Sequence, residues 1–515
     1  MIPPRRWPRR ILLALNIFTL LCLVSAGSVY AYAQLRLGQI KVISSLPFHH
    51  TSGDSALSPM NILLVGNNSR VGLDPSEAAQ FGTAADAGGA HSDVTMILHL
   101  NPKTGAASLL SIPRDMFVPL PPNNISGTVG KIDSALNGSN YQYTDGAAQL
   151  IETIQNDLGI NIDHYVEINF DGFQKTVDAL GGINMYFPTL LYDLESNLRN
   201  PRVGCLHLNG QEALAVVRSR HLQYFVQGDN INRPQSWPQE NESDLARIQR
   251  DHTFLKVLAS SVVSQGITAN LFKANDVLSS LISQVTIDAQ LKPDLLTLAK
   301  RFRSVNLGSV PELTLPITVV PDAQYFYKGG AYGTVDFPSQ PVDAQVIAQW
   351  QQASFPKVDP SSFSVQVDNI SSIAHEAATT VDGLNLQGFH ATDNGQGNIP
   401  SDNVETMIRY NPNGNGQAQA ETVLQSLSGS IMMKADPSVS SGVIELDTGT
   451  SMSVVSPSTT SSTTAPPSTS ASSSGSTAAT SAVPTPGNQP VSSSTDQLSP
   501  WDPIACSPGQ PVFSG

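Results

Sequence analysis

Runs of apolar residues, separated by turns rich in Pro, Gly and Asn, divide most of the chain into alternating candidate strands and helices. Two such runs, Asp93–Leu100 and Ala106–Ile112, flank the turn at 101–105 and predict a β-hairpin. Apolar residues at helical spacing predict helices at about 145–158, 171–180, 244–264, 272–284 and 292–303, and shorter apolar runs predict strands at about 60–65, 164–169, 183–187 and 314–320. This mixture predicts an α/β (α+β) domain, with a mixed sheet flanked by helices, over 59–350.

A second unit is predicted at 363–454, because apolar runs there follow the order strand, helix, strand, strand, helix, strand. That order predicts a small α/β sandwich. Residues 455–499 are almost entirely Ser, Thr, Pro, Ala and Gly, and such a composition cannot bury enough apolar surface to offset its ordering entropy. We therefore predict a disordered tail over 455–515. Its last residues, Trp501–Gly515, regain apolar side chains, so docking onto another part of the chain is the alternative for them.

The amino-terminal residues predict a membrane anchor. Four arginines at positions 5, 6, 9 and 10 precede an apolar run at 11–33, which is long enough to cross a bilayer. The arginines place residues 1–10 in the cytoplasm, so the bulk of the chain would lie outside a single-pass span and a stalk at 34–58. A cleaved signal peptide is the competing interpretation of the same run.

Charge and cysteine content narrow the function further. Only 14% of residues are charged and the net charge is −14, so a general nucleic-acid binder is excluded. Of the three cysteines, Cys22 lies inside the predicted span. Cys205 and Cys506 would both lie outside the cytoplasm, where either one disulfide or two separate thiols is compatible with the sequence.

Arg218 and Arg220 are the first candidate site residues. The apolar run Ala213–Val217 before them predicts a buried strand or its approach, in which residues two apart point to one face. Two guanidinium groups this close repel each other unless an anion lies between them, and a phosphate suits their planar donors. Ion pairs with surface carboxylates are the alternative.

Three further segments add charges. In the predicted hairpin Asp93 would lie opposite Pro113, beside Arg114, although a simple ion pair closing the strands would give the same pattern. Arg247 and Arg250 share one face of a predicted helix, where a solvated face balanced by Asp244 and Asp251 is the alternative, and the one we favour for Arg250. Lys131 is a further candidate cation, or an ordinary surface lysine.

Taken together, these segments resemble the LytR-CpsA-Psr (LCP) enzymes of bacterial cell-wall assembly. The resemblance covers roughly 60–265, and 363–454 resembles the LytR C-terminal-type domain of actinobacterial members. Its motifs here, in the family's order, are Asn61–Gly66, Ser92–Asp93, Leu110–Asp115, Lys131–Ala135, Val177–Ile183, Leu208–Leu214, Arg218–Arg220 and Asp244–Arg250.

The resemblance implies a membrane-bound phosphotransferase, or glycopolymer ligase. Such an enzyme moves a wall glycopolymer from an undecaprenyl-pyrophosphate carrier to peptidoglycan, forms a phosphodiester, and can also act as a pyrophosphatase. An apolar groove would hold the lipid. The polymer expected from the actinobacterial pattern is arabinogalactan or a related polysaccharide.

The resemblance also assigns residues to roles. The catalytic residues would be Arg114, Asp115, Arg218 and Arg220, and the pyrophosphate would be bound by Arg114, Lys131, Arg218, Arg220 and Arg247. Mg²⁺ or Mn²⁺ would be held by Asp93 and, more weakly, by Asn68. Phosphoryl transfer needs positioning and charge neutralisation, which arginines and a divalent cation supply.

This chain departs from the family pattern at three positions. Asn68 replaces the usual Asp, His91 replaces the usual Arg before Ser92, and Asp251 replaces the usual Gln. An asparagine offers a metal an oxygen but no charge. A non-catalytic relative that binds polyprenyl phosphates or wall polymer is therefore the alternative function.

Overall fold

The computed structural model describes residues 38–48, 58–70, 90–121, 129–137, 146–241, 243–264, 284–302, 310–320, 324–351, 358–401, 405–455 and 498–514. The described residues form two compact units: unit 1 consists of those within Met1–Leu109, Ile162–Glu312 and Gln497–Gly515, and unit 2 of those within Leu110–Asn161 and Leu313–Asp496. Both combine distant segments, so the linear domain boundaries stay predictions.

Several predicted segments lie outside the described residues. They are the cytoplasmic tail at 1–10, the membrane span at 11–33, nearly all of the helix at 272–284, and the Ser/Thr/Pro-rich residues 456–497. Among the residues that the structure does describe, no helix is both long enough and apolar enough to cross a membrane.

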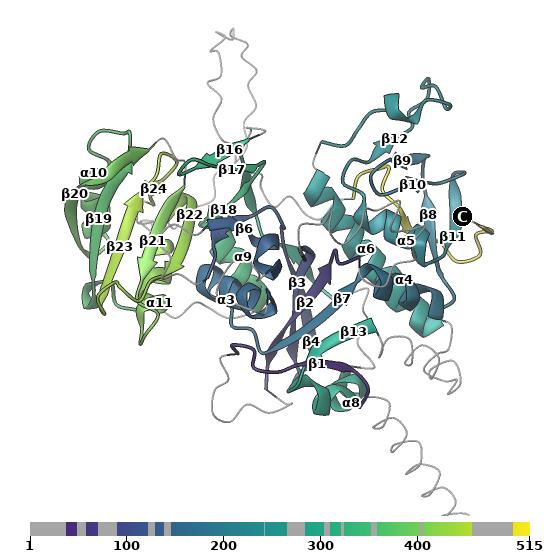
Figure 1. The fold of residues 1–515 in the computed structure, drawn as a ribbon, viewed down its shortest axis with the longest axis horizontal. Coiled ribbons are helices and arrows are strands. Elements are labelled where there is room, and N and C mark those ends of the chain that lie inside the picture. Colours follow the sequence, from purple (N-terminus) through teal and green to yellow (C-terminus); the bar gives the residue numbers. More distant parts are fainter. Residues whose placement is uncertain are drawn as a thin grey trace, which may run out of the picture. The chain divides into compact units, whose positions relative to one another are not determined.

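A mixed sheet, most of which belongs to unit 1, has the strand order β1-β13-β7-β2-β3-β4-β14 (Figure 1). Its strands are β1 (Lys41–Ile43), β2 (Met60–Asn67), β3 (Ser92–Asn101), β4 (Ala106–Ile112), β7 (His164–Asn169), β13 (Val285–Asp288) and β14 (Glu312–Thr314). β2 is antiparallel to β3 and parallel to β7. The strands of the predicted hairpin are confirmed as β3 and β4. Within the predicted stalk, residues 41–43 form β1 and pair with β13.

Three helices of unit 1 pack around a second core. They are α4 (Phe170–Ala179), α5 (Gly210–Arg218) and α6 (Ser243–Ser264), and α8 (Leu291–Phe302) packs separately against the central sheet through Leu291 and Leu298. A Cβ at Gly210 would lie 2.3 Å from the carbonyl oxygen of Gln174, so the glycine permits α5 to approach α4 closely. This second core, which includes Val216 and Phe254, is where the helices carrying the candidate site residues are fixed.

The carboxy-terminal residues 498–514 belong to unit 1. They contribute β25 (Ile504–Ala505) and β26 (Val512–Ser514) to a sheet with β8 (Ile183–Phe187) and β11 (Gly204–Leu208), in the order β25-β8-β11-β26. A disulfide joins Cys205 of β11 to Cys506, with 5.7 Å between their Cα atoms. The bridge is thus the correct alternative for these cysteines. The prediction of disorder is wrong for 498–514, because strand pairing and the disulfide hold this segment.

A small sheet of β9 (Leu191–Asp193), β10 (Leu198–Arg199) and β12 (Gln223–Tyr224) completes unit 1.

Unit 2 is built on a larger mixed sheet in the order β15-β18-β22-β21-β23-β19-β20, with β24 paired to β22. Its strands are β15 (Ile317–Val319), β18 (Asp336–Gln340), β19 (Ser364–Ser371), β20 (His390–Ser401), β21 (Thr406–Tyr410), β22 (Leu427–Ala435), β23 (Val443–Thr448) and β24 (Ser453–Val454). Its helices are α3 (Gly146–Leu158), α9 (Val342–Gln351), α10 (Glu376–Leu386) and α11 (Gly416–Leu424). Two strand pairs, β5 (Phe117–Pro119) with β6 (Val129–Lys131) and β16 (Tyr325–Tyr327) with β17 (Gly330–Gly333), complete it.

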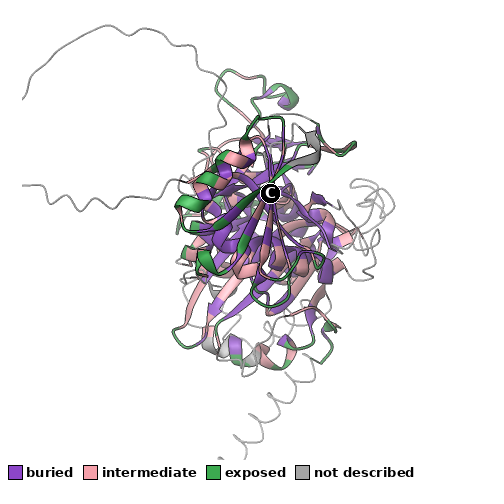
Figure 2. Ribbon diagram, turned by 90° about the vertical axis from the view of Figure 1, so that its left-hand side faces the viewer, coloured by how far each residue is buried: buried purple, intermediate pink, exposed green. Residues whose placement is uncertain are grey.

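The predicted α/β sandwich at 363–454 is present within this sheet, although β22 was not predicted. In Figure 2 buried and partly buried residues make up much of the strands of this region, whereas the described residues of β20 are mostly exposed. Met433 of β22 donates its N–H to Asp157 of α3 at 3.0 Å, and the hydroxyl of Tyr410 donates to the Asn156 carbonyl at 2.9 Å. The sandwich is therefore attached to α3 through buried polar contacts.

Candidate active site

A cavity of about 280 Å³ opens in unit 1 between the central sheet and the helices α4, α5 and α6. Its wall is largely apolar and includes Leu64, Val166, Phe173, Leu214, Phe254 and Leu255. Charged side chains are gathered in the same cavity, namely Asp93, Arg218, Arg247 and Asp251. An apolar wall combined with a few charged groups suits a ligand that has an apolar body and an anionic head.

Arg218 ends α5, and this corrects the predicted strand. Asn209 caps the helix: its side chain accepts the N–H of Glu212 at 3.0 Å, and the Glu212 carboxylate accepts the N–H of Asn209 at 2.9 Å. This capping box favours a helix over the apolar run that follows it. The rule that residues two apart share one strand face therefore does not apply to Arg218 and Arg220.

The Arg218 guanidinium lies in an apolar and electrostatically mixed environment. Its Cζ atom is 4.5 Å from the centre of the Phe170 ring, which is a cation–π contact. Burial lowers the pKa of Arg218, Asp93 and Asp193 oppose that shift, and the positive charge of Arg70 adds to it. Arg70, which lies three residues after the end of β2 at Asn67, was not among the predicted site residues. An anion in the cavity would relieve the repulsion between these two cations.

Asp193 holds the turn Arg218–His221, which we call the arginine turn. Its Oδ2 accepts hydrogen bonds from the Ser219 hydroxyl at 2.7 Å, the Arg220 N–H at 3.1 Å and the His221 N–H at 3.0 Å. The carboxylate is buried at the end of β9. A charged acceptor bonded to three consecutive residues fixes the backbone from which Arg218 and Arg220 project.

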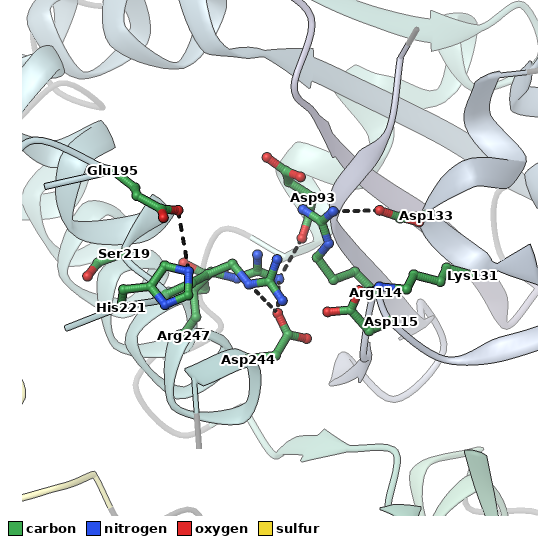
Figure 3. Close-up of polar contacts among 12 residues, drawn as sticks. Asp93, Arg114, Asp115, Lys131, Asp133, Glu195, Ser219, His221, Asp244 and Arg247 are labelled. Carbon is green, nitrogen blue, oxygen red and sulfur yellow. Dashed lines mark hydrogen bonds and ion pairs between the residues drawn. The ribbon is translucent and has the colours of Figure 1, made fainter. Parts of the chain in front are cut away.

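Arg247 contacts both Asp93 and Asp244 (Figure 3). Its Nη2 donates to the backbone carbonyl of Asp93 at 2.7 Å and is 2.9 Å from Oδ1 of Asp244. The same Asp244 oxygen lies 3.5 Å from Nε of Arg220. Asp244 thus links two of the predicted arginines, while Arg247 fixes the backbone of the predicted metal ligand.

Asp251 lies on α6 and lines the same cavity as Asp93. It is buried, and among the described residues neither of its carboxylate oxygens has a hydrogen-bond donor, although Nε of Arg247 is 3.9 Å away. Burial raises its pKa to about 7, Arg247 and Arg250 oppose the shift, and Asp244 and Asp93 add to it. A buried carboxylate without a donor is costly unless a proton or a cation accompanies it.

These side chains bear on the predicted metal. Mg²⁺ is commonly held by one or two carboxylates together with substrate phosphates and water, and Asp93 and Asp251 are two carboxylates in one cavity. Asn68 does not line the cavity, and its Oδ1 accepts the His91 N–H at 3.0 Å. No group of three or more His, Cys, Asp or Glu suited to a metal occurs within the described ranges. The residues present therefore fit a divalent cation that the substrate helps to hold.

Arg250 is neither a ligand-binding residue nor part of a solvated face, so our interpretation of it was wrong. Its side chain is 0% exposed. It forms two hydrogen bonds of 2.8 Å with the Glu240 carboxylate, one of 3.0 Å with Asp502, and one of 2.6 Å with the Ser219 carbonyl. A helix face that reads as charged in the sequence is here covered by residues 240 and 502, which lie elsewhere in the chain.

The remaining predicted residues lie in unit 2. Arg114 is 2.6 Å from Asp133, and Lys131 is 2.8 Å from Asp115. Asp115 also accepts the Asp336 N–H through its backbone carbonyl at 3.0 Å. Each predicted cation thus has a carboxylate partner in its own unit. The predicted approach of Arg114 to Asp93 joins the two units and stays a prediction.

Comparison with known proteins defines the class first. The family model described as LytR_cpsA_psr family matches residues 31–336, which is more than half of the chain, and the chain belongs to this family. Residues 362–454 match a second model, described as LytR cell envelope-related transcriptional attenuator.

The chain is also similar to individual members of the family. The chain is 30% identical over 266 residues to the "Probable cell wall biosynthesis protein LcpB" of Corynebacterium glutamicum, over 52% of this chain and 55% of that protein. It is 32% identical over 240 residues to the polyisoprenyl-teichoic acid–peptidoglycan teichoic acid transferase TagU of Halalkalibacterium halodurans, over 46% of this chain and 63% of that protein. The chain thus spans less than two thirds of the length of these relatives.

A solved structure described as a LytR-Csp2A-Psr enzyme from Actinomyces oris aligns with a TM-score of 0.43 at 17% identity. The alignment covers 60% of this chain and 96% of that one.

Proposed function

We propose that this protein is a transferase that moves a wall glycopolymer from an undecaprenyl-pyrophosphate carrier to peptidoglycan. The observation that carries the proposal is the cavity of unit 1, in which an apolar wall and the guanidinium groups of Arg218 and Arg247 are combined. A prenyl chain fits the wall, and a pyrophosphate fits the arginines. Membership of the family and the similarity to the transferase TagU support the same class of reaction.

In the proposed reaction an acceptor hydroxyl of peptidoglycan forms a bond to the phosphorus that carries the glycopolymer. The bond from that phosphorus to the bridging oxygen breaks, and undecaprenyl phosphate leaves. Arg218 and Arg247 would stabilise the negative charge that develops on the phosphate oxygens. Arg220 would add a third cation, and Asp244 would hold Arg220 and Arg247 near each other. Asp93 and Asp115 are the two candidates for accepting the hydroxyl proton.

A divalent cation would be held by Asp93 and Asp251, and when bound it would neutralise charge on the transferred phosphate. The chain's own part is to hold these carboxylates in place. Arg247 does so for Asp93 by binding its carbonyl at 2.7 Å. In this proposal Asp251 would provide the second carboxylate for the cation, in place of the Asp that the family pattern has at position 68, where this chain has Asn.

Two further parts of the proposal rest on the sequence. Residues 11–33 would anchor the enzyme at the membrane that contains its lipid substrate. Arg114 and Lys131 would assist the pyrophosphate site from unit 2, oriented by Asp133 and Asp115.

The test uses the full-length protein in detergent with Mg²⁺, a synthetic prenyl-pyrophosphate-linked glycan and peptidoglycan fragments. Transfer is measured as glycan attached to the fragments, and release of prenyl phosphate is measured separately. We expect transfer by the unaltered protein. Release without attachment would reduce the function to a pyrophosphatase.

The alternative is a relative that binds polyprenyl phosphates without catalysis, and the observation in its favour is the buried carboxylate of Asp251 in the cavity proposed to bind an anionic ligand. Tight binding of the prenyl pyrophosphate with neither release nor attachment would establish this alternative.

A further inference from the structure

Arg250 contacts the carboxy-terminal segment 498–514 through a buried ion pair. Arg250 lies on α6, whereas Asp502 lies 252 residues further along the chain, and both side chains are 0% exposed. Arg250 Nη1 donates to Asp502 at 3.0 Å, while its Nη2 donates to the Ser219 carbonyl at 2.6 Å. One guanidinium group therefore connects the carboxy-terminal segment to the middle of the arginine turn.

The arginine turn is held from two directions. Asp193 accepts its side-chain and N–H donors, as described above, and Arg250 binds the carbonyl of Ser219. Ser219 lies between Arg218 and Arg220, so the direction of its peptide group sets where both guanidinium groups point. Because Asp193 fixes only the donors of the turn, the carbonyl side depends on Arg250.

Asp502 in turn fixes Arg250. Glu240 is bonded to both terminal nitrogens of Arg250, and Asp502 is the second carboxylate at Nη1. Burial alone would lower the pKa of Arg250, but Glu240 and Asp502 raise it. Without Asp502, Nη1 of Arg250 would lose one of its two carboxylate acceptors, and Glu240 alone would direct the guanidinium toward the Ser219 carbonyl.

The carboxy-terminal segment is itself built to hold Asp502 in place. Oδ2 of Asp502 accepts the Ser499 N–H at 3.0 Å, and the neighbouring Trp501 stacks on Tyr224 with 3.9 Å between the ring centres. Cys506 forms the disulfide with Cys205, and β25 pairs with β8. In Figure 1 this segment lies beside α5 and α6, the helices that carry Arg218 and Arg250.

We propose that Asp502 is a positioning residue for the phosphate-binding arginines: through Arg250 it orients the Ser219 carbonyl and thereby Arg218 and Arg220. The carboxy-terminal segment is then a working part of the site. This inference rests on the proposed function, because it assigns Asp502 an effect on pyrophosphate binding.

The experiment compares full-length protein carrying Asp502→Asn with the unaltered protein. Asparagine keeps the size and an oxygen acceptor but removes the charge. Binding of inorganic pyrophosphate is measured by calorimetry at a temperature at which both proteins are folded. We expect Asp502→Asn to weaken binding by roughly 3–30-fold, as expected for loss of coupling to a residue that does not touch the ligand. In the transfer assay KM should rise more than kcat falls.

Three controls separate positioning from general stability. Gln510→Ala alters an exposed turn of the same segment, where Gln510 accepts the Ser507 N–H at 3.1 Å, and should leave binding unchanged. Asp502→Glu restores the charge and should recover part of the affinity. Cys506→Ser should weaken binding in the same direction as Asp502→Asn, because it releases the segment without altering Asp502.

The outcomes are distinguishable. If Asp502→Asn lowers the melting temperature but binds pyrophosphate as the unaltered protein does, the residue is only structural and the inference is wrong. If the unaltered protein itself binds no pyrophosphate, the proposed function fails instead. If Asp502→Asn does not fold, the comparison of Asp502→Glu and Cys506→Ser with Gln510→Ala decides, and equal affinity in all three would overturn the inference.

Discussion

Two arginines of unit 1, the half-buried Arg218 and the fully buried Arg250, differ in what surrounds them. Arg218 lines the cavity and lies over the Phe170 ring, and burial lowers its pKa. Arg250 is enclosed, forms hydrogen bonds with Glu240, Asp502 and the Ser219 carbonyl, and has a raised pKa. The first guanidinium faces space that a ligand can fill, whereas the second has its counter-charges built in. Arg218 is therefore placed to contact a ligand, whereas Arg250 is placed to hold together the residues that form the site.

The comparison predicts the largest loss of stability at Arg250. Arg250→Met leaves the carboxylates of Glu240 and Asp502 buried without their cation, and removal of one partner of a buried ion pair costs about 3–5 kcal/mol. Thermal or urea unfolding of the full-length protein would measure the change. The triple variant Arg250→Met, Glu240→Gln, Asp502→Asn should recover part of the loss, because no unpaired charge remains. A single variant as stable as the unaltered protein would refute the contrast.

Arg218 should show the opposite behaviour, with a large loss of activity and a small loss of stability. Removing a group that stabilises developing charge costs about 10²–10³-fold in rate, so Arg218→Ala should lower kcat/KM for transfer by about that factor. Its unfolding should change by less than that of Arg250→Met, since its charge faces the cavity. Arg218→Lys keeps the charge without the planar donors and should retain intermediate activity. Normal transfer by Arg218→Ala would remove the cavity from the proposed mechanism.

Sequence alone could not separate the arginines of α6. Arg247 and Arg250 are three residues apart on one helix, which predicts a shared face, and nothing local indicates that Glu240 and Asp502 cover one and not the other. Asp502 also lies beyond a long Ser/Thr/Pro-rich stretch, where composition predicted disorder. Contacts between residues so distant in sequence carry no local signal.

Other features did have a local signal. The hairpin strands at 93–100 and 106–112 and the helices α3, α4, α6 and α8 followed from apolar spacing and are confirmed. The helix at 210–218 was missed, although Asn209 and Glu212 have the spacing of a capping box. Asp193 was not predicted as a site residue, because its hydrogen bonds to residues 219–221 join segments that are far apart in the sequence.

Unit 2 contains a buried acidic group, Asp157, for which no salt bridge is found among the described residues. Asp157 is buried, and burial raises its pKa from 3.8 to about 8, against the hydrogen bond from Met433. Between these pH values the folded chain binds one more proton than the unfolded chain, so the free energy of unfolding falls as the pH rises from about 4 to about 8. Asp157→Asn keeps an acceptor for Met433 without the charge.

We expect Asp157→Asn to stabilise the protein at pH 8 by at least about 1.4 kcal/mol, the equivalent of one pKa unit, and to change little at pH 4. Urea unfolding at the two pH values measures this. A residual slope should remain, because burial also raises the pKa of Glu421, to about 7. Asp382→Asn, an exposed position on α10, is the matched control and should follow the unaltered protein. If Asp157→Asn follows it as well, Asp157 is not titrating between these pH values.

The smallest effect is expected at Glu195, which contacts the arginine turn from outside. Its carboxylate lies 3.3 Å from Nε2 of His221, but its side chain is 74% exposed. An exposed pair of this kind contributes about 0–1 kcal/mol and is screened by salt. Glu195→Gln should therefore leave both unfolding and pyrophosphate affinity nearly unchanged. Asp193→Asn, two residues earlier, removes a buried charge that accepts three donors of the turn, and should weaken affinity clearly. If Glu195→Gln weakened pyrophosphate affinity as much as Asp193→Asn, the buried hydrogen bonds of Asp193 would not be what holds the arginines in place. If neither substitution weakened it, Asp193 would have no role in positioning them.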